Sequence, residues 1–246
     1  MRKPQVKYQE VQGMTYQQGW DLQTRLHNHL KDRKVQWRRY TSEDKQPLIQ
    51  EHQLIFCEHS PVYTLGKSGS IDHLLLNDDQ LNDGAIEFFK INRGGDITYH
   101  GPGQITGYPI FDMDEFFTDI HKYVRMLEEC MIRLLALYDV KGYREERFTG
   151  VWIAADDKYP IKRKICAIGV HLSRWVTMHG FALNVNTDLT YFENIIPCGI
   201  QEDDKTVTSL EKELGKKIDI REVKLHLKSI FAEIFDFEYI EEYNEG

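Results

Sequence analysis

The sequence predicts an α+β fold, in which helices pack on a mixed, largely antiparallel sheet. Short runs rich in β-branched and aromatic residues cluster between residues 54 and 185, and amphipathic helical patterns lie on both sides of that region and once within it. Hydrophobic residues make up 41% of the 246 residues and charged residues 28%, which is typical of a folded chain and not of a disordered one. Because no Pro/Gly/Ser-rich linker divides the sequence, we expect a single domain over residues 1–246.

Apolar residues at helical spacing predict helices over 15–31 and 117–139. Gly142 is expected to stop the second helix. Toward the C-terminus we expect a capping box at 208–211, a helix stop at Gly215 and a helix start at Asp219.

The expected strands and extended segments share interleaved β-branched, aromatic and small residues, with glycine or proline near several of their ends. They are 54–57, 62–66, 86–91, 104–110, 148–155, 164–172 and 175–185.

Charge and composition argue against several classes of function. Lys and Arg number 31 against 39 Asp and Glu, so the net charge is −8 and we expect no nucleic-acid partner. The absence of an 18-residue apolar stretch predicts no membrane span. No apolar run follows the charged residues 1–7, so we expect no secretory signal and a cytoplasmic protein. The four cysteines are widely spaced and no metal-ligand motif is present, so we expect free thiols, no metal and no cofactor.

A glycine-rich stretch at 93–104 concentrates polar side chains in a short loop. Glycines let the backbone approach a ligand closely, and the N–H groups of such a loop can bind an oxyanion or a carbonyl oxygen. The alternative is a tight connection between strands, with His100 bonded to a backbone partner.

Two further segments suggest acyl transfer through a thiol. Cys198 lies between Pro197 and Gly199, so it sits in a turn from which a thiol can project into a cleft. Lys164 begins a buried strand, and a lysine next to a thiolate lowers the pKa of the thiol. The alternative for a cysteine is a small buried side chain, which suits Cys57, Cys130 and Cys166 better than Cys198.

The segment 177–186 alternates small and bulky residues, as expected of a strand that lines an apolar pocket. Taken alone, the segment is equally an ordinary core strand with His179 at its edge.

Together, five segments resemble the lipoyl(octanoyl) transferases of lipoate biosynthesis, with a matching core of about 48–238. The segments are 58–66, 93–104, 164–169, 179–186 and 197–199, in the order of that family. The resemblance implies the fold shared by lipoate and biotin protein ligases.

The resemblance also implies the reaction and its residues. An octanoyl group would pass from acyl carrier protein to a lysine of apo lipoyl domains, those of 2-oxoacid dehydrogenases and the glycine cleavage H protein, with no ATP. Cys198 would carry the acyl group as a thioester, and Lys164 would lower the pKa of that thiol. The implied acyl-contacting residues are Arg93, Gly94, Gly95, Asp96, Ile97, Thr98, Tyr99, His100, Ala167, Ile168, Gly169, Gly180, Phe181 and Ala182. His179 is a candidate for proton transfer or support, and we expect a monomer.

Three alternatives remain open at this point. An ATP-dependent lipoate ligase would share the fold but need no thiol, a non-catalytic lipoyl-domain or acyl-binding protein would not need an activated Cys198, and a thioesterase would release the acyl group to water. The acceptor amine must also lose a proton, to Lys164, His100 or His179. Because acyl carrier proteins are acidic, we expect a basic docking patch drawn from Arg144, Arg147, Lys162, Arg163 and Arg174.

Overall fold

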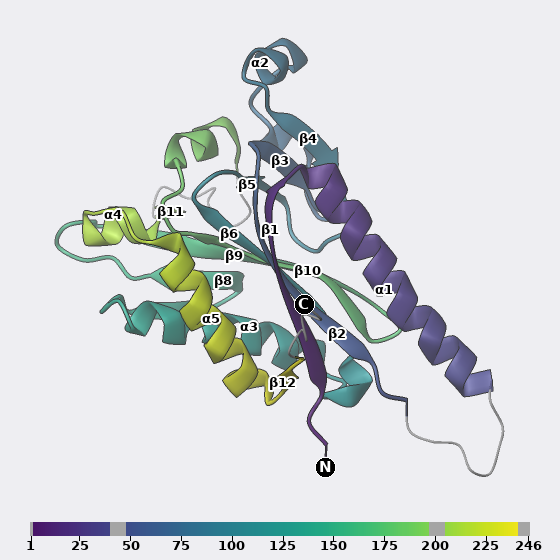
Figure 1. Cartoon of the computed structure of the whole chain (residues 1–246). Coiled ribbons are helices and arrows are strands. Elements are labelled where there is room, and N and C mark those ends of the chain that lie inside the picture. Colours follow the sequence, from purple (N-terminus) through teal and green to yellow (C-terminus); the bar gives the residue numbers. More distant parts are fainter. Residues whose placement is uncertain (1, 40–47, 197–204, 241–246) are drawn as a thin grey trace, which may run out of the picture.

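The fold is organised around a large twisted sheet, which is viewed nearly edge-on in the computed structural model (Figure 1). The structure describes residues 2–39, 48–196 and 205–240. Across the sheet the strands are β12 (Glu238–Tyr239), β1 (Gln5–Met14), β2 (Glu51–His59), β6 (Gln104–Ile110), β10 (Val176–Asn184), β9 (Lys162–Ser173), β8 (Phe148–Ile153) and β7 (Gly142–Glu145), while β11 (Lys205–Val207) also pairs with β9.

Strand direction confirms the predicted mixed sheet. β1 runs parallel to β2 and β12, and β11 runs parallel to β9, whereas the other neighbours in the sheet are antiparallel. A second, smaller sheet has the order β4 (Glu87–Lys90), β3 (Val62–Leu65) and β5 (Ile97–His100).

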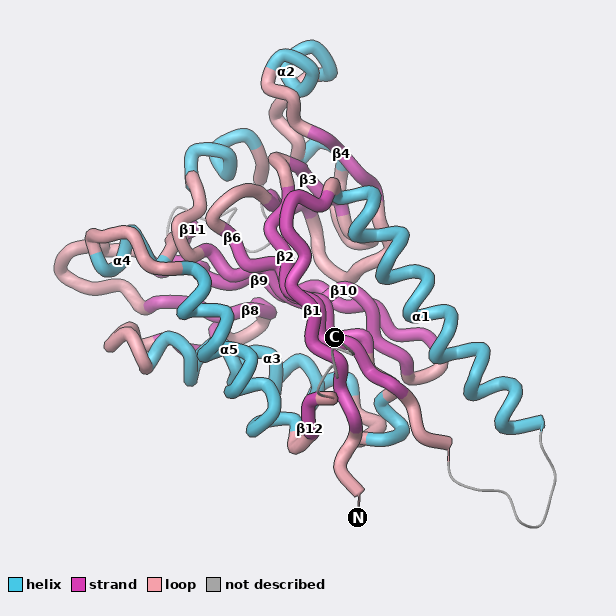
Figure 2. The backbone as a smooth tube through the Cα atoms, in the orientation of Figure 1, coloured by secondary structure: helices cyan, strands magenta, loops and turns pink. Residues whose placement is uncertain are grey.

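Helices cover both faces of the large sheet (Figure 2). α1 (Tyr16–Arg39) lies along one face, and α3 (Ile120–Ala136) and α5 (Ile220–Phe235) lie side by side on the other. The remaining helical segments are short: α2 (Asp78–Asp83), α4 (Leu210–Leu214), η1 (Ile71–His73), η2 (Met113–Glu115) and η3 (Leu189–Asn194).

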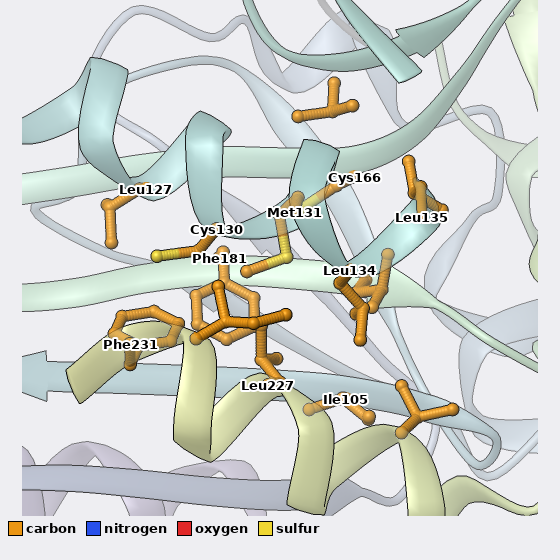
Figure 3. Close-up of a cluster of buried hydrophobic side chains, with 14 of the residues drawn as sticks. Ile105, Leu127, Cys130, Met131, Leu134, Leu135, Cys166, Phe181, Leu227 and Phe231 are labelled. Atoms are coloured by element: carbon orange, nitrogen blue, oxygen red, sulfur yellow. The ribbon is translucent and has the colours of Figure 1, made fainter. Parts of the chain in front are cut away.

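The alternation of side chains along β2 divides the interior into two layers. Leu54 and Phe56 join the core beneath α3 and α5, whereas Ile55 and Cys57 join the core beneath α1 together with Leu30. Successive residues of a strand point to opposite faces, so a sheet covered on both sides is apolar at every position. Figure 3 shows the α3–α5 layer, in which apolar side chains from both helices meet those of the sheet.

The expected helices and strands are present, with differences at their ends. α1 continues to Arg39, beyond residue 31, and its last turns are held by buried Lys34, which bonds Asp112 at 2.7 Å and adds no apolar residue to the helical pattern. α3 ends at Ala136, and Gly142 starts β7 instead of stopping the helix. Ser209, not Thr208, caps α4.

The sequence patterns missed β1 altogether. Only two of its ten residues, Val6 and Met14, are buried, so it lacks the alternation that marks a half-buried strand. Its pairing with β2 and the two-residue β12 holds it in place.

Candidate active site

A cavity of about 380 Å³ lies between the large sheet and the small one. Its floor is built from small residues that face each other on neighbouring strands: Gly180 pairs with Gly169, and Ala182 pairs with Ala167. Thr106 of β6 continues the row on the other side of Ala182. Cross-strand partners share one face of a sheet, so this run of small side chains leaves space that larger residues would fill.

The glycine-rich loop forms one wall of the cavity. The amide of Gly94 donates to the carbonyl of Val170 at 3.0 Å, which ties the loop to β9. Gly95 has a φ of +86°, in the left-handed region that favours glycine. Arg93 is buried, and its Nη2 donates to the carbonyl of Thr64 at 2.6 Å, so its guanidinium also braces the wall against β3.

A buried chain of hydrogen bonds fixes the protonation of His100. The side-chain nitrogen of Gln104 donates to Asn184 Oδ1 at 2.9 Å and to the carbonyl of Tyr99 at 3.0 Å, so its oxygen is left to accept. His100 Nδ1 lies 2.9 Å from that oxygen and therefore carries the hydrogen. His100 Nε2 then accepts from the hydroxyl of Thr64 at 3.2 Å. Both ring nitrogens are engaged in a neutral imidazole.

Burial keeps the histidines around the cavity neutral. It lowers the pKa of His100 to about 3, and the same cause lowers the pKa of His179 to about 3, helped by the cationic Arg93. His179 has a φ of +60°, and its Nε2 lies 2.7 Å from Asn92 Oδ1. Neither imidazole is a strong base at neutral pH, because both bind a proton only in acid.

Lys164 lies on β9 and lines the same cavity. Its Nζ stands 4.6 Å from the centroid of the Trp152 indole on β8, a cation–π contact that orients the side chain. The prediction that Lys164 starts its strand was slightly wrong, because β9 begins at Lys162 where β11 pairs with it. The neighbouring Cys166 does not share the cavity.

Cys166 belongs to the core because it pairs in regular register with the core residue Leu183 on β10. The register of β8 against β9 shifts beyond this point, since Val151 pairs with Cys166 and Trp152 with Lys164, so Lys164 need not share the face of Cys166. Cys166 is fully buried in the α3–α5 layer, near Met131 (Figure 3). Burial raises the pKa of its thiol, and Cys166 is the small buried side chain that the sequence predicts.

Cys198 lies outside the described residues, but the described chain on either side of its segment lies at the cavity. Before it, the amide of Ile196 donates to the carbonyl of His73 at 2.8 Å. After it, β11 runs beside β9, with Val207 opposite Lys164. Phe192 and Val207, which flank the segment, both line the cavity.

The structure gathers nearly all the other predicted site residues around this one cavity. Those that line it are Arg93, Gly94, Gly95, Asp96, Ile97, Thr98, His100, Lys164, Ala167, Ile168, Gly169, His179, Gly180, Phe181 and Ala182. Tyr99 does not line it. The Tyr99 ring is instead buried in a separate apolar cluster with Tyr63, stacked on Tyr191 with centroids 4.6 Å apart.

Several cavity residues were not identified from the sequence. Gln104, Val170 and Asn184 lie within or beside segments that the sequence singled out, and Arg147 was expected only in the docking patch. The others are Tyr16, Thr106, Tyr108, Ile120, Val124, Phe148, Thr149, Phe192 and Val207. Ile120 is the first residue of α3 and remains partly exposed. Its place at the very start of the apolar stripe was the one sequence feature that could have indicated a role outside the core.

Two members of the expected basic docking patch, Arg163 and Arg174, lie apart from the others, whereas Arg144, Arg147 and Lys162 lie on or beside the neighbouring strands β7 to β9. Arg163 is only 1% exposed and bonds Asp156 and Glu213, so it is a buried structural cation. Arg174 comes directly after β9, whose extended strand separates it from Lys162 at the other end by roughly 40 Å. Arg147, at the turn between β7 and β8, is exposed and lines the cavity.

Among the described residues, no group of three or more His, Cys, Asp or Glu side chains could hold a metal ion. In the same part of the chain, no helix is both long and apolar enough to cross a membrane.

The chain is similar to known proteins over nearly its whole length. Residues 15–232 match the lipoyl protein ligase A/B catalytic domain. An octanoyltransferase of Cytophaga hutchinsonii is 54% identical over 222 residues, which are 90% of this chain and 88% of that protein. One of Flavobacterium psychrophilum is 52% identical over 232 residues, or 94% of this chain and 97% of that protein.

Solved structures agree with this at the level of the fold. A bipartite lipoate protein ligase from Thermoplasma acidophilum superposes with a TM-score of 0.63 at 17% identity, covering 98% of this chain and 88% of that one. Lipoate-protein ligase A bound with ATP gives a TM-score of 0.62 at 16% identity, covering 98% and 90%. The architecture is therefore that of the lipoate protein ligases. The chain has the lipoyl protein ligase A/B catalytic domain and belongs to the octanoyltransferase family of enzymes.

Proposed function

We propose that this enzyme transfers an octanoyl group from acyl carrier protein to a lysine of apo lipoyl domains, through a thioester on Cys198. Octanoyl transfer follows the names of its relatives at 54% and 52% identity. The observation that carries the Cys198 step is the placement of Lys164 in a cavity that is also lined by Phe192 and Val207, on either side of the segment that contains Cys198.

Chain connectivity supports the same site. Cys198 follows Ile196 by two residues, and two residues span at most about 7 Å. Ile196 is bonded to His73 beside the wall of the cavity, and the chain returns at β11 next to Lys164. A thiol from this segment has a short path to the cavity and to a lysine that stabilises its thiolate.

The chemistry balances without a cofactor. The Cys198 thiolate attacks the carbonyl carbon of the octanoyl thioester, and the thiolate of the carrier's prosthetic arm leaves and takes a proton from the Lys164 ammonium, which leaves the Lys164 amine neutral. The amine of the acceptor lysine then attacks the new thioester, an amide bond forms, and the Cys198 thiolate leaves. One thioester replaces another in the first step, so that step needs no activation by ATP.

The acceptor amine must give up one proton in the second step, and Lys164 is the residue to which we assign it. His100 has both ring nitrogens in hydrogen bonds, and burial lowers its pKa to about 3. His179 bonds Asn92, and burial lowers its pKa to about 3 as well. Lys164 faces the cavity and holds a position set by Trp152.

We further propose that the whole chain acts as one catalytic domain in the cytoplasm, on the lipoyl domains of 2-oxoacid dehydrogenases and the glycine cleavage H protein. The N-terminal β1 pairs with both β2 and the C-terminal β12, so both ends of the described chain belong to one sheet. The three cysteines among the described residues, Cys57, Cys130 and Cys166, are free thiols, as a reducing compartment allows.

Intact-protein mass spectrometry tests the proposal. The enzyme is mixed with octanoyl acyl carrier protein without ATP, alongside Cys198→Ser and the buried-thiol control Cys166→Ser. We expect one octanoyl group on the wild type and on Cys166→Ser, none on Cys198→Ser, and discharge by an apo lipoyl domain.

The alternatives give different outcomes in the same experiment. An adduct that appears only with ATP and free octanoate indicates a ligase, and release of free octanoate in place of acylated domain indicates a thioesterase. Binding of the lipoyl domain with no acyl transfer under either condition indicates a non-catalytic binding protein.

A further inference from the structure

His73 was not identified from the sequence, and it joins the cavity wall to the chain that leads to Cys198. Its Nδ1 lies 2.5 Å from Asp96 Oδ2, and Asp96 lines the cavity. The other oxygen of Asp96 accepts the amide of Ile97 at 2.7 Å. The carboxylate is therefore held through both oxygens, and His73 is held to a fixed point of the wall.

The backbone around His73 holds the residues just before the Cys198 segment. The carbonyl of His73 accepts the amide of Ile196 at 2.8 Å, and the amide of Leu75 donates to the carbonyl of Asn194 at 2.9 Å. Between them Leu74 and Ile195 form an antiparallel bridge. A short stretch of sheet thus fixes the register of the chain two residues before Cys198.

The residues before η1 are bonded to the glycine-rich loop in the same way. The amide of Gly66 donates to the carbonyl of Asp96, that of Lys67 to Arg93 and that of Ser68 to Gly95, at 3.0 to 3.2 Å. The segment 66–75 therefore touches the loop with one end and residues 194–196 with the other. The His73–Asp96 contact connects these two sets of backbone bonds through a side chain.

We propose that His73 is a positioning residue for acyl transfer: through its bond to Asp96 it sets the chain at 194–196 against the cavity wall, and so sets where Cys198 meets the acyl carbonyl. This inference rests on the proposed thioester at Cys198. A displacement of about 1 Å at a reacting group costs on the order of 100-fold in rate, so a lost positioning contact has a measurable effect.

Single-turnover loading of octanoyl from acyl carrier protein tests the kinetic part. For His73→Ala we expect the loading rate at saturating donor to fall roughly 10- to 100-fold, with the half-saturating donor concentration unchanged. His73→Asn places an amide N–H near the position of Nδ1 and is expected to restore most of the rate. His29→Ala, an exposed histidine on α1, is the matched control and loads as wild type does.

Hydrogen–deuterium exchange of the same full-length variants tests the placement without relying on activity. His73→Ala is expected to speed exchange at the Ile196 amide, and His73→Asn to leave it slow. Wild-type loading by His73→Ala, equal losses in His73→Ala and His73→Asn, or unchanged exchange at Ile196 each overturns the inference. Failure of the wild type to form a Cys198 adduct overturns the proposed function instead, and exchange then still decides whether His73 positions the chain.

Discussion

His100 Nδ1 and the side-chain oxygen of Gln104 lie 2.9 Å apart in the buried wall of the cavity. Since the amide nitrogen of Gln104 already donates to Tyr99 and Asn184, this contact fixes which nitrogen of His100 carries the hydrogen. The imidazole is thereby a neutral structural element of the site, held by the residues on either side of it.

Acid is expected to destabilise the protein through its buried histidines. Burial lowers the pKa of His100 and His179 to about 3 and of His59 to about 4, while the unfolded side chains titrate near their ordinary value of 6.5. Between about pH 4 and 6.5 the unfolded chain binds more protons, so the stability that is fully present above pH 6.5 is lost as the pH falls. Each histidine contributes at most roughly 1.4 kcal/mol per pH unit in that window.

Urea unfolding at pH 7.0, 6.0 and 5.0 measures this effect. His100→Gln removes one titrating group and is expected to show a shallower loss of free energy of unfolding on acidification. The exposed His29→Gln serves as the control and keeps the wild-type slope. A wild-type slope in His100→Gln contradicts the prediction.

The small residues on the cavity floor are expected to set the length of the acyl chain. Ala167 faces Ala182 across β9 and β10, so a leucine there projects into the cavity. Ala167→Leu should load octanoyl more than about tenfold slower and a butyryl donor at nearly the wild-type rate, because the shorter chain needs less space. Loading is followed by mass spectrometry with each donor.

Ala136→Leu, on the exposed end of α3, is the control for that substitution and should load both donors normally. Equal slowing with both donors would show that Ala167→Leu disturbs the reacting groups and not the chain-length limit.

Native alkylation is expected to modify a single cysteine. Cys57, Cys130 and Cys166 are fully buried, and burial raises the pKa of each thiol, so they are neither accessible nor ionised. Iodoacetamide should add one group to the native wild type and none to Cys198→Ser, and add four groups to the wild type after denaturation. Peptide mapping that finds native label on any of the three buried cysteines contradicts this.

Arg147 is the member of the expected docking patch that we predict to act on the donor. It is exposed at the turn between β7 and β8, with a φ of +67°, and lines the cavity. Arg147→Glu should raise the half-saturating concentration of octanoyl acyl carrier protein roughly three- to tenfold, and less so in high salt, because the carrier is acidic.

An uncharged octanoyl thioester of N-acetylcysteamine separates docking from chemistry, since Arg147→Glu should leave its use unchanged. Arg25→Glu, an equal charge reversal on the exposed side of α1, is the matched control. If both reversals weaken use of the carrier alike, the effect is one of net charge and not of a local contact.

Local patterns predicted the elements that bury one clear face. The strand over 104–110 has the expected bounds, α3 follows from its apolar stripe, and α5 starts as expected at Asp219. Sequence patterns failed to predict the elements whose buried side chains are polar or few. Lys34 extends α1 through an ion pair with Asp112, and β1 depends on its neighbours for its position.

The sequence by itself determined the α+β class, the glycine-rich loop and the residue types of the site, because side-chain chemistry and spacing along the chain are local properties. Only the tertiary structure decided which of these residues share the cavity. Cys166 pairs with Leu183 and joins the core while Lys164, beyond a register shift between β8 and β9, lines the cavity, and the Tyr99 ring stacks on Tyr191 outside it. The structure alone also revealed His73, whose partners Asp96 and Ile196 lie 23 and 123 positions further along the chain. Such contacts depend on strand register and on packing between distant segments, which no local pattern specifies.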